Sequence, residues 1–205
     1  MKPAARMLFL LVCAASLPVG AQQAPRANLI ECTGPFAKDS SHSRLVEAFG
    51  AANVVFGDIG GPEGESQLGS NVFPDEPRRR FTIVWKDEAG RRNPQEIHFR
   101  EGSAWRTRAG IHVGSNLAEV ERLNGKPFTM WGFEWDYGGY VRDWRGGTLD
   151  QVNGECLLGM RFELSNKAPH SASDRILGER TIPSNDPEVR AVRPRTSEIY
   201  LKYPQ

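Results

Sequence analysis

The sequence predicts an α+β protein in which two tandem helix-plus-antiparallel-meander repeats form one compact body. Two short segments carry the signature of a capped amphipathic helix, and alternating apolar residues of the strand type follow each segment. Equivalent features of the two halves lie at nearly constant separations, 75 positions for Gly50 and Gly125 and 77 positions for Phe81 and Leu158. Sequence identity between the halves is low, so a chance match is the alternative to a duplication.

The first 21 residues have the features of a signal peptide for export. Lys2 and Arg6 give a positive start, residues 7–19 are largely apolar, and residues 19–21 offer a small-residue cleavage site. The apolar run is shorter than the roughly 20 residues of a membrane-spanning helix, so we expect no stable membrane insertion. A lipid anchor at Cys13 is a poorer alternative, because a branched valine precedes that cysteine. The sequence therefore predicts a periplasmic or secreted protein.

Export changes the interpretation of the cysteines. Without the signal peptide two remain, Cys32 and Cys156, which are 124 positions apart. Two cysteines in an oxidising compartment predict one disulfide bond. The alternative, a catalytic thiol at Cys32, lacks a local signature for a histidine partner.

The charge balance argues against nucleic-acid binding. The chain has 26 basic and 25 acidic residues, and nucleic-acid binding depends on excess positive charge. The one dense basic run, residues 78–80, follows a proline-rich turn and is expected in a loop or at a strand start. We divide the chain into the signal peptide 1–21, a first helix-sheet half 22–108, a second half 109–166, and a polar connector with a C-terminal strand, 167–205.

The first half begins with a helix predicted within residues 40–56. Ser40 or Ser41 is a suitable N-cap and Gly50 a suitable terminator. Period-two alternation then predicts a half-buried strand. The apolar residues that define the helix and the strand are Leu45, Val46 and Phe49, then Phe81, Ile83 and Trp85.

The second half repeats this order within residues 113–164. Asn116 and Glu119 have the spacing of a capping box, Gly125 is a left-handed terminator, and Pro127 prevents continuation of the helix. The apolar residues of this helix and of the later strand are Leu117, Val120 and Leu123, then Leu158, Met160, Phe162 and Leu164.

The stretch "GIHVGSNLAEVERLNGKPF" resembles the G-x-x-x-x-E-V-x-x-x-x-G-x-P phrase of the small BamE-type outer-membrane assembly proteins. The resemblance covers residues 114–127 clearly and the first half only loosely. A duplicated helix-plus-meander unit is also the architecture of the secreted β-lactamase-inhibitor protein, so the chain is similar to both at the level of fold. It further resembles exported bacterial proteins with the phrase "NGKPF…GF-WDYGG", to which no activity is assigned. Fold resemblance does not fix function.

The C-terminal part contains three further predicted features. Residues 165–174 are polar and predict a loop, and residues 183–187 predict a turn that can start a helical turn. Residues 197–203 place Ile199, Leu201 and Tyr203 on one face. This pattern predicts a strand that completes or covers the sheet.

An aromatic segment, residues 131–144, is the candidate functional surface. As a strand, its odd positions 131–137 share one face, Gly138 and Gly139 form a hairpin, and the returning strand shows residues 140, 142 and 144. The rings could cover the second helix as core, or could present residue types that dominate protein interfaces. The candidate binding residues are Trp131, Trp135, Tyr137, Tyr140, Arg142 and Trp144.

Catalytic motifs give weaker signals. The four histidines have no metal-ligand spacing, no G-x-S-x-G elbow occurs, and Gly125-Lys126 is not a phosphate loop. Glu134 and Asp136 could form a carboxylate pair for glycoside chemistry, but acids on an exposed strand face are usually solvated. We therefore expect no cofactor, no metal, and a non-catalytic protein that binds an envelope or secreted protein, as an inhibitor or an assembly accessory. The alternative is a periplasmic hydrolase acting on cell-wall or envelope material.

Overall fold

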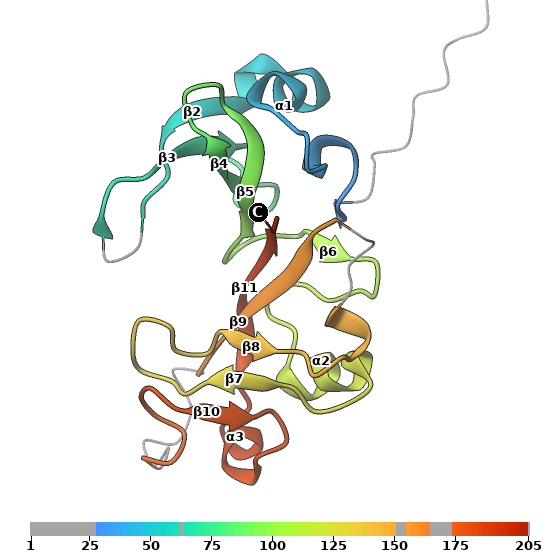
Figure 1. The fold of residues 1–205 in the computed structure, drawn as a ribbon, viewed down its shortest axis with the longest axis vertical. Helices are drawn as coiled ribbons and strands as arrows, with labels where there is room; N and C mark the ends of the chain where they lie inside the picture. The colour runs from blue at the N-terminus through green and yellow to red at the C-terminus, as the bar shows by residue number, and fades with distance from the viewer. Residues whose placement is uncertain (1–27, 62–63, 151–154, 165–173, 205) are drawn as a thin grey trace, which may run out of the picture.

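The computed structural model describes residues 28–61, 64–150, 155–164 and 174–204 (Figure 1). The predicted signal peptide and nearly all of the predicted loop at 165–174 lie outside the described residues. The described part is mostly β-structure, with sheets of six, three and two strands and three short α-helices. None of the described helices has the length and apolar character needed to cross a membrane.

The largest sheet has six antiparallel strands and combines four consecutive strands of the N-terminal half with the C-terminal strand (Figure 1). The C-terminal strand lies next to one edge of this sheet and pairs Ile199 with Phe99 on one side and with Met160 on the other. In sheet order the strands are β2 (Val54–Asp58), β3 (Leu68–Val72), β4 (Phe81–Asp87), β5 (Arg92–Phe99), β11 (Arg195–Lys202) and β9 (Leu157–Glu163). The predicted C-terminal strand is confirmed, and it completes the sheet.

The two smaller sheets flank this one. A three-stranded antiparallel sheet has the order β10 (Thr181–Pro183), β7 (Thr129–Trp131) and β8 (Val141–Asp143). A parallel pair joins β1 (Leu29–Ile30) to β6 (Arg106–Thr107). Short 3-10 helices are η1 (Gly34–Phe36), η2 (Ala51–Asn53) and η4 (Thr148–Asp150).

The helix boundaries follow the predicted caps. In α1 (His42–Phe49) the Ser41 hydroxyl accepts a hydrogen bond from the Arg44 N–H at 3.2 Å. In α2 (Leu117–Asn124) the Asn116 side chain accepts from the Glu119 N–H at 2.9 Å, and Gly125 ends the helix with φ 78°. The predicted turn at 183–187 leads into α3 (Pro187–Val192). Local cap chemistry was therefore sufficient to place these helix ends.

The predicted fold class is wrong. After α1 the strands β2 to β5 form one continuous meander, but after α2 the strands are divided between two sheets. The hairpin β7–β8 pairs with β10 in the small sheet, whereas β9 pairs with β11 in the large sheet. The molecule is thus mainly β with three short helices, and the tandem helix-plus-meander repeat is not formed. Equal spacing of turn glycines and apolar residues does not determine which strands pair.

One buried core connects the sheets and helices. Its N-terminal part is an aromatic group in which Phe36 lies 5.2 Å from Phe81 and 5.3 Å from Trp105 between ring centroids.

The predicted disulfide is present: Cys32 and Cys156 are bonded, with their Cα atoms 6.0 Å apart. The bond ties the start of the described chain to the residue preceding β9. Disulfide formation is compatible with export.

Candidate functional site

The aromatic segment does not form the predicted pair of long strands. Strand β7 ends at Trp131, and residues 134–139 form a turn before β8 begins. Glu134 has a left-handed φ of 61°, which breaks the alternation of side chains along a strand. At Gly132 an added Cβ would lie 2.6 Å from the Gly178 carbonyl oxygen, so the backbone approaches a neighbouring loop closely. The expected single aromatic strand face is therefore wrong.

Two rings of the segment belong to the core. Phe133 is buried, and its backbone bonds to the chain at Ile176 and Gly178. Trp144 is 5% exposed, lies 5.0 Å from the Phe128 ring, and donates its Nε1–H to the Leu158 carbonyl at 2.8 Å. Trp144, a candidate binding residue, is thus placed away from the surface.

Three other rings contact one another at the surface. The Trp131 and Trp135 ring centroids are 5.5 Å apart at 88°, and those of Trp135 and Tyr137 are 5.4 Å apart at 63°. The Arg142 guanidinium carbon lies 4.6 Å from the Trp131 ring centroid, within the range of a cation–π contact. Tyr137 is 62% exposed, more than any other large hydrophobic residue described. We call Trp131, Trp135, Tyr137 and Arg142 the aromatic cluster.

Hydrogen bonds orient the members of the aromatic cluster. Trp135 donates its Nε1–H to the Gly132 carbonyl at 2.9 Å, and Arg142 donates to the Thr181 hydroxyl of β10. The Gly138 N–H donates to the Trp135 carbonyl at 2.8 Å, which closes the turn. The exposed rings are therefore mounted on a defined turn.

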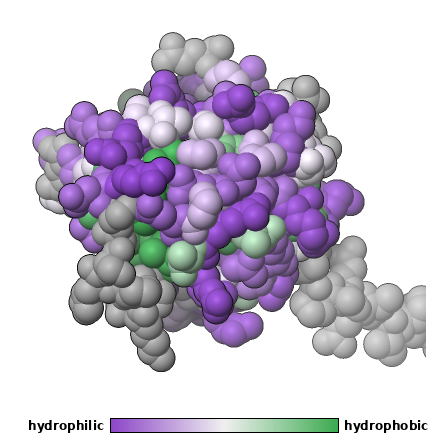
Figure 2. Space-filling view, turned by 90° about the horizontal axis from the view of Figure 1, so that it is seen from below, coloured by the Kyte–Doolittle hydropathy of each residue, from purple (hydrophilic) through white to green (hydrophobic). Residues whose placement is uncertain are grey.

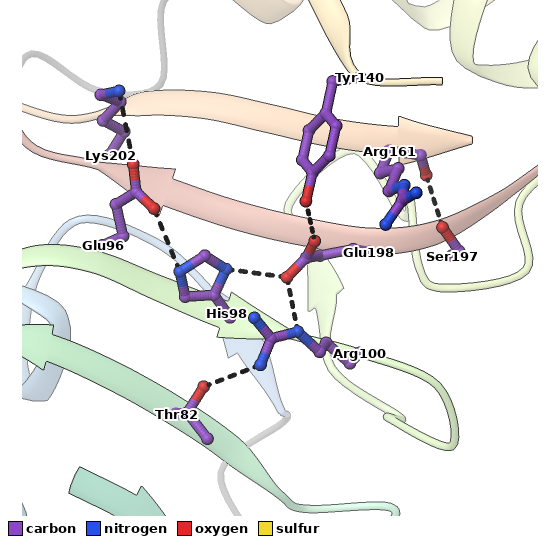
Figure 3. A network of polar contacts seen from close by, with 9 residues as sticks. All are labelled: Thr82, Glu96, His98, Arg100, Tyr140, Arg161, Ser197, Glu198 and Lys202. Atoms are coloured by element: carbon purple, nitrogen blue, oxygen red, sulfur yellow. Dashed lines mark hydrogen bonds and ion pairs between the residues drawn. The ribbon is translucent and has the colours of Figure 1, made fainter. Parts of the chain in front are cut away.

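Tyr140, the last candidate residue, points into a polar network on the six-stranded sheet (Figure 3). Its hydroxyl donates to Glu198 Oε2 at 3.0 Å, and the Arg161 guanidinium carbon lies 5.1 Å from its ring centroid. The strand register explains why Tyr140 and Glu198 lie close together. Arg161 of β9 lies opposite Glu198 of β11, and an isolated antiparallel β-bridge pairs Arg161 with Tyr140 on its other side. A single row of cross-strand neighbours thus connects the two sheets.

Glu198 is the centre of the network, with a side chain only 7% exposed. Its Oε1 lies 2.8 Å from His98 Nδ1 and 2.8 Å from Arg100 Nε (Figure 3). The other ring nitrogen of His98, Nε2, lies 3.2 Å from Glu96 Oε2. Lys202 contacts Glu96 in turn, at 3.4 Å. We call Glu96, His98, Arg100, Tyr140 and Glu198 the polar brace.

The pKa shifts in the polar brace favour the charged forms of Glu198 and His98 and the neutral form of Tyr140. Burial alone raises the pKa of Glu198, but hydrogen bonding and charge from His98 and Arg100 outweigh burial and lower it to about 2. Burial alone lowers the pKa of His98, but its hydrogen bonds to Glu198 and Glu96 raise it above 6.5 overall. Burial, with the nearby Glu198 charge, raises the pKa of Tyr140 to about 12. The two carboxylates on either side of the His98 ring thus stabilise its protonated form against the cost of burial.

This arrangement supports a structural role for the polar brace. Both His98 nitrogens contact carboxylates, so the ring has no free nitrogen with which to accept a proton from a substrate. The brace instead holds Tyr140, the residue that follows the aromatic turn, through its hydrogen bond to Glu198. The neighbouring strand β9 holds the turn itself: Arg161 donates to the Gly138 carbonyl at 3.0 Å, and the Phe162 N–H donates to the Gly139 carbonyl at 2.9 Å.

Sequence reasoning missed the polar brace, because His98 and Glu198 are 100 positions apart. A local signal existed in the period-two polar positions 96 and 98 of β5 and 100 directly after it; positions 96 and 98 lie opposite residues 202 and 200 of β11. Only the pairing of β5 with β11 shows that these positions meet.

The carboxylates considered for catalysis, Glu134 and Asp136, are exposed on the aromatic turn. The described residues contain no group of three or more histidine, cysteine or acidic side chains that could hold a metal ion. His42 Nδ1 lies 2.8 Å from the Ser70 hydroxyl, and His112 Nδ1 lies 2.7 Å from the Val113 carbonyl.

Comparison of the chain with family models, with characterised proteins and with solved structures finds no match. The resemblance of residues 114–127 to BamE-type proteins, and that of the whole to the β-lactamase-inhibitor protein, therefore stay predictions from the sequence.

Proposed function

We propose that this protein is an exported, non-catalytic binding module that holds an envelope or secreted protein through the aromatic cluster. The observation that carries the proposal is the surface contact of Trp131, Trp135, Tyr137 and Arg142, which lie on the β7–β8 hairpin and its hydrogen-bonded turn. Tryptophan, tyrosine and arginine are the residue types most enriched among energetic hot spots of protein interfaces.

Pre-organisation supports this role. A binding surface that must be ordered on association costs roughly 0.5–1.5 kcal/mol for each mobile side chain. Here the rings already contact one another, and the Tyr140–Glu198 and Arg161–Gly138 hydrogen bonds hold the turn from beneath. The polar brace thus reduces the ordering cost of the proposed interface.

The geometry of the rings favours a protein partner over a flat sugar ring. Interplanar angles of 88° and 63° present ring edges as well as faces. Exposed Glu134, Asp136 and Arg142 surround the rings with both signs of charge. Aromatic anchors with a polar, charged rim are the usual anatomy of a protein interface.

Export is part of the same proposal. The predicted signal peptide directs the chain out of the cytoplasm, and the Cys32–Cys156 bond suits an oxidising compartment. The partner is therefore sought among periplasmic, envelope and secreted proteins.

The test is site-specific photo-crosslinking followed by identification of the adduct. A photoreactive amino acid replaces Tyr137 in one sample and Leu68 in a matched control, a position 41% exposed on β3. Each purified protein is incubated with an envelope extract of the source organism and irradiated. We expect one dominant adduct from position 137 and none from position 68. The same adducts from both positions, or no adduct from position 137, would contradict the proposal.

Mutagenesis provides the second arm of this test. The double variant Trp135→Ser/Tyr137→Ser removes two members of the aromatic cluster, and Val55→Ser/Leu68→Ser removes two exposed apolar residues elsewhere. Capture of the crosslinked partner should be lost in the first variant and kept in the second. If both variants capture the partner equally, the interface does not include the aromatic cluster.

A further inference from the structure

A second surface, separate from the aromatic cluster, gathers positive charge at the α2–α3 end of the molecule. Seen from below, this part of the protein is mainly hydrophilic, with small separate hydrophobic patches (Figure 2). A groove of about 750 Å³ is lined by α2, by the turn after it, and by the segment from α3 to β11. Five cations and one acid, Glu121, line this cationic groove: Arg122, Lys126, Arg190, Arg193 and Arg195.

This charge is a local feature, because the whole chain is nearly neutral, with 26 basic and 25 acidic residues. Concentrated charge of one sign in a groove raises the local concentration of ligands of opposite charge. A groove of this volume is in the range of small-molecule sites. The charge distribution therefore points to a compact anion as the ligand.

The five cations fall into two groups. Arg190 pairs with Glu121 and so joins α3 to α2, and Arg195 donates to the Gly114 carbonyl at 2.9 Å, so both of these side chains already have partners within the protein. Arg122, Lys126 and Arg193 have no side-chain hydrogen bond or ion pair to another described residue, and all three are exposed. Three unpaired cations on one groove match a ligand that carries more than one negative charge.

Arg193 has an unusual backbone for an arginine. It ends α3 in the left-handed conformation, with φ 48° and ψ 57°, a position that favours glycine or asparagine. Gly125 has the corresponding position at the end of α2. Helix termination does not explain an arginine at position 193, whereas its place on the wall of the groove does.

We infer that the cationic groove binds phosphate groups, presented either by a free oligophosphate or by an anionic lipid headgroup. Four of its five cations are arginines, whose planar guanidinium binds phosphate oxygens in a bidentate manner. Leu117, Pro127 and Pro194 add apolar surface beside the charges. The inference does not depend on the proposed protein partner, because the groove and the aromatic cluster share no residue.

The test measures tripolyphosphate binding by calorimetry at low and at physiological salt. The variant Arg122→Gln/Arg193→Asn removes two unpaired cations and places at position 193 a residue suited to its backbone. The control Arg78→Gln/Arg80→Gln removes the same charge from the other basic run. We expect saturable binding by the parent, weakened by salt. The groove variant should bind about tenfold more weakly or worse, and the control should match the parent.

A flotation assay with vesicles of phosphatidylglycerol and phosphatidylcholine distinguishes the two phosphate sources. Binding of tripolyphosphate alone assigns the groove to free phosphates, and binding of vesicles alone assigns it to lipid headgroups. Lys126→Gln serves as a second, single-site variant, and the unfolding transition of each protein checks its fold. Absence of binding to both probes in the parent, or equal weakening in the control, would overturn the inference.

Discussion

Two of the aromatic groups in the described residues, one near α1 and the aromatic cluster, contain rings at similar distances but differ in their exposure to solvent. In the group near α1, Phe81 lies 5.5 Å from Phe99 and 5.4 Å from Trp105, and all three are nearly inaccessible to solvent. In the aromatic cluster, Trp131, Trp135 and Tyr137 lie 5.4–5.5 Å apart at the surface. The first group comes from separate elements, and the second from seven consecutive residues.

This difference shows how chain connectivity governs burial. Rings on strands far apart in sequence can face one another across a core, because the sheet brings several faces together. Rings on one short segment have no second sheet face opposite them to cover them. Of the four rings within residues 131–137, only Phe133 is buried in the core. The turn is instead held by the hydrogen bonds of Tyr140 to Glu198 and of Arg161 to the Gly138 carbonyl, and three rings remain at the surface.

The largest effect is expected in the buried group. Phe99→Ala should lower the free energy of unfolding by about 3–5 kcal/mol, because it leaves a cavity among well-packed rings. Urea denaturation measures this loss. A loss below about 1 kcal/mol would show that the group near α1 contributes no more than a surface cluster does.

The second-largest loss of stability is expected when the polar brace is disrupted. Glu198→Gln leaves His98 and Arg100 as buried or half-buried cations without their main carboxylate, so we expect a loss of roughly 3 kcal/mol. The control Glu119→Gln changes an exposed acid of α2 and should have little effect. Equal stability of the two variants by denaturation would show that Glu198 does not hold the turn.

The contribution of the polar brace to the free energy of unfolding should depend on pH, whereas that of the apolar group near α1 should not. The Glu198 pKa is lowered from 4.5 to about 2, so its contribution is present above pH 4.5 and is lost as the pH falls toward 2. The His98 pKa is raised above 6.5, so its contribution is complete below pH 6.5 and is lost as the pH rises through the raised value. The free energy of unfolding, measured against pH, should be largest between these limits.

The variant His98→Gln provides the control for this pH profile. The alkaline decrease in stability should disappear, because the titrating imidazole is gone, while Phe99→Ala should lower the whole curve without changing its shape. An alkaline decrease that persists in His98→Gln would assign the pH dependence to another group.

The smallest effect on stability is expected at the aromatic cluster. Trp135→Ser/Tyr137→Ser changes side chains that are exposed or half-buried, so the free energy of unfolding should change by about 1 kcal/mol or less. Denaturation of this variant beside Val55→Ser/Leu68→Ser measures the difference. A loss comparable to that of Phe99→Ala would mean that the rings serve the core.

Prediction from the sequence succeeded where the signal was local. Ser41, Asn116 and Gly125 define helix ends through their own backbone and side-chain chemistry, and the cysteine count was sufficient to predict the Cys32–Cys156 bond. The alternation of apolar residues at 81–85, 158–164 and 197–203 predicted strands that the structure contains as β4, β9 and β11.

Prediction failed where distant segments decide the structure. Strand β10 pairs with β7, so the β7–β8 hairpin becomes part of a separate three-stranded sheet. The three residues of β10 follow a polar stretch and carry no sequence pattern that predicts this pairing. Glu134 has a left-handed backbone conformation, so the chain turns where the sequence pattern predicted a continuous strand. The meeting of His98 with Glu198 depends on the pairing of β5 with β11 and has no local motif.

The most direct test of the central claim measures the affinity of the crosslinked partner for Trp135→Ser/Tyr137→Ser at a pH where both proteins are fully folded. If the aromatic cluster is a braced binding surface, the variant should bind about 30-fold more weakly or worse, the loss typical of interface hot spots, with its stability nearly unchanged. Unchanged affinity in a stably folded variant would contradict the account.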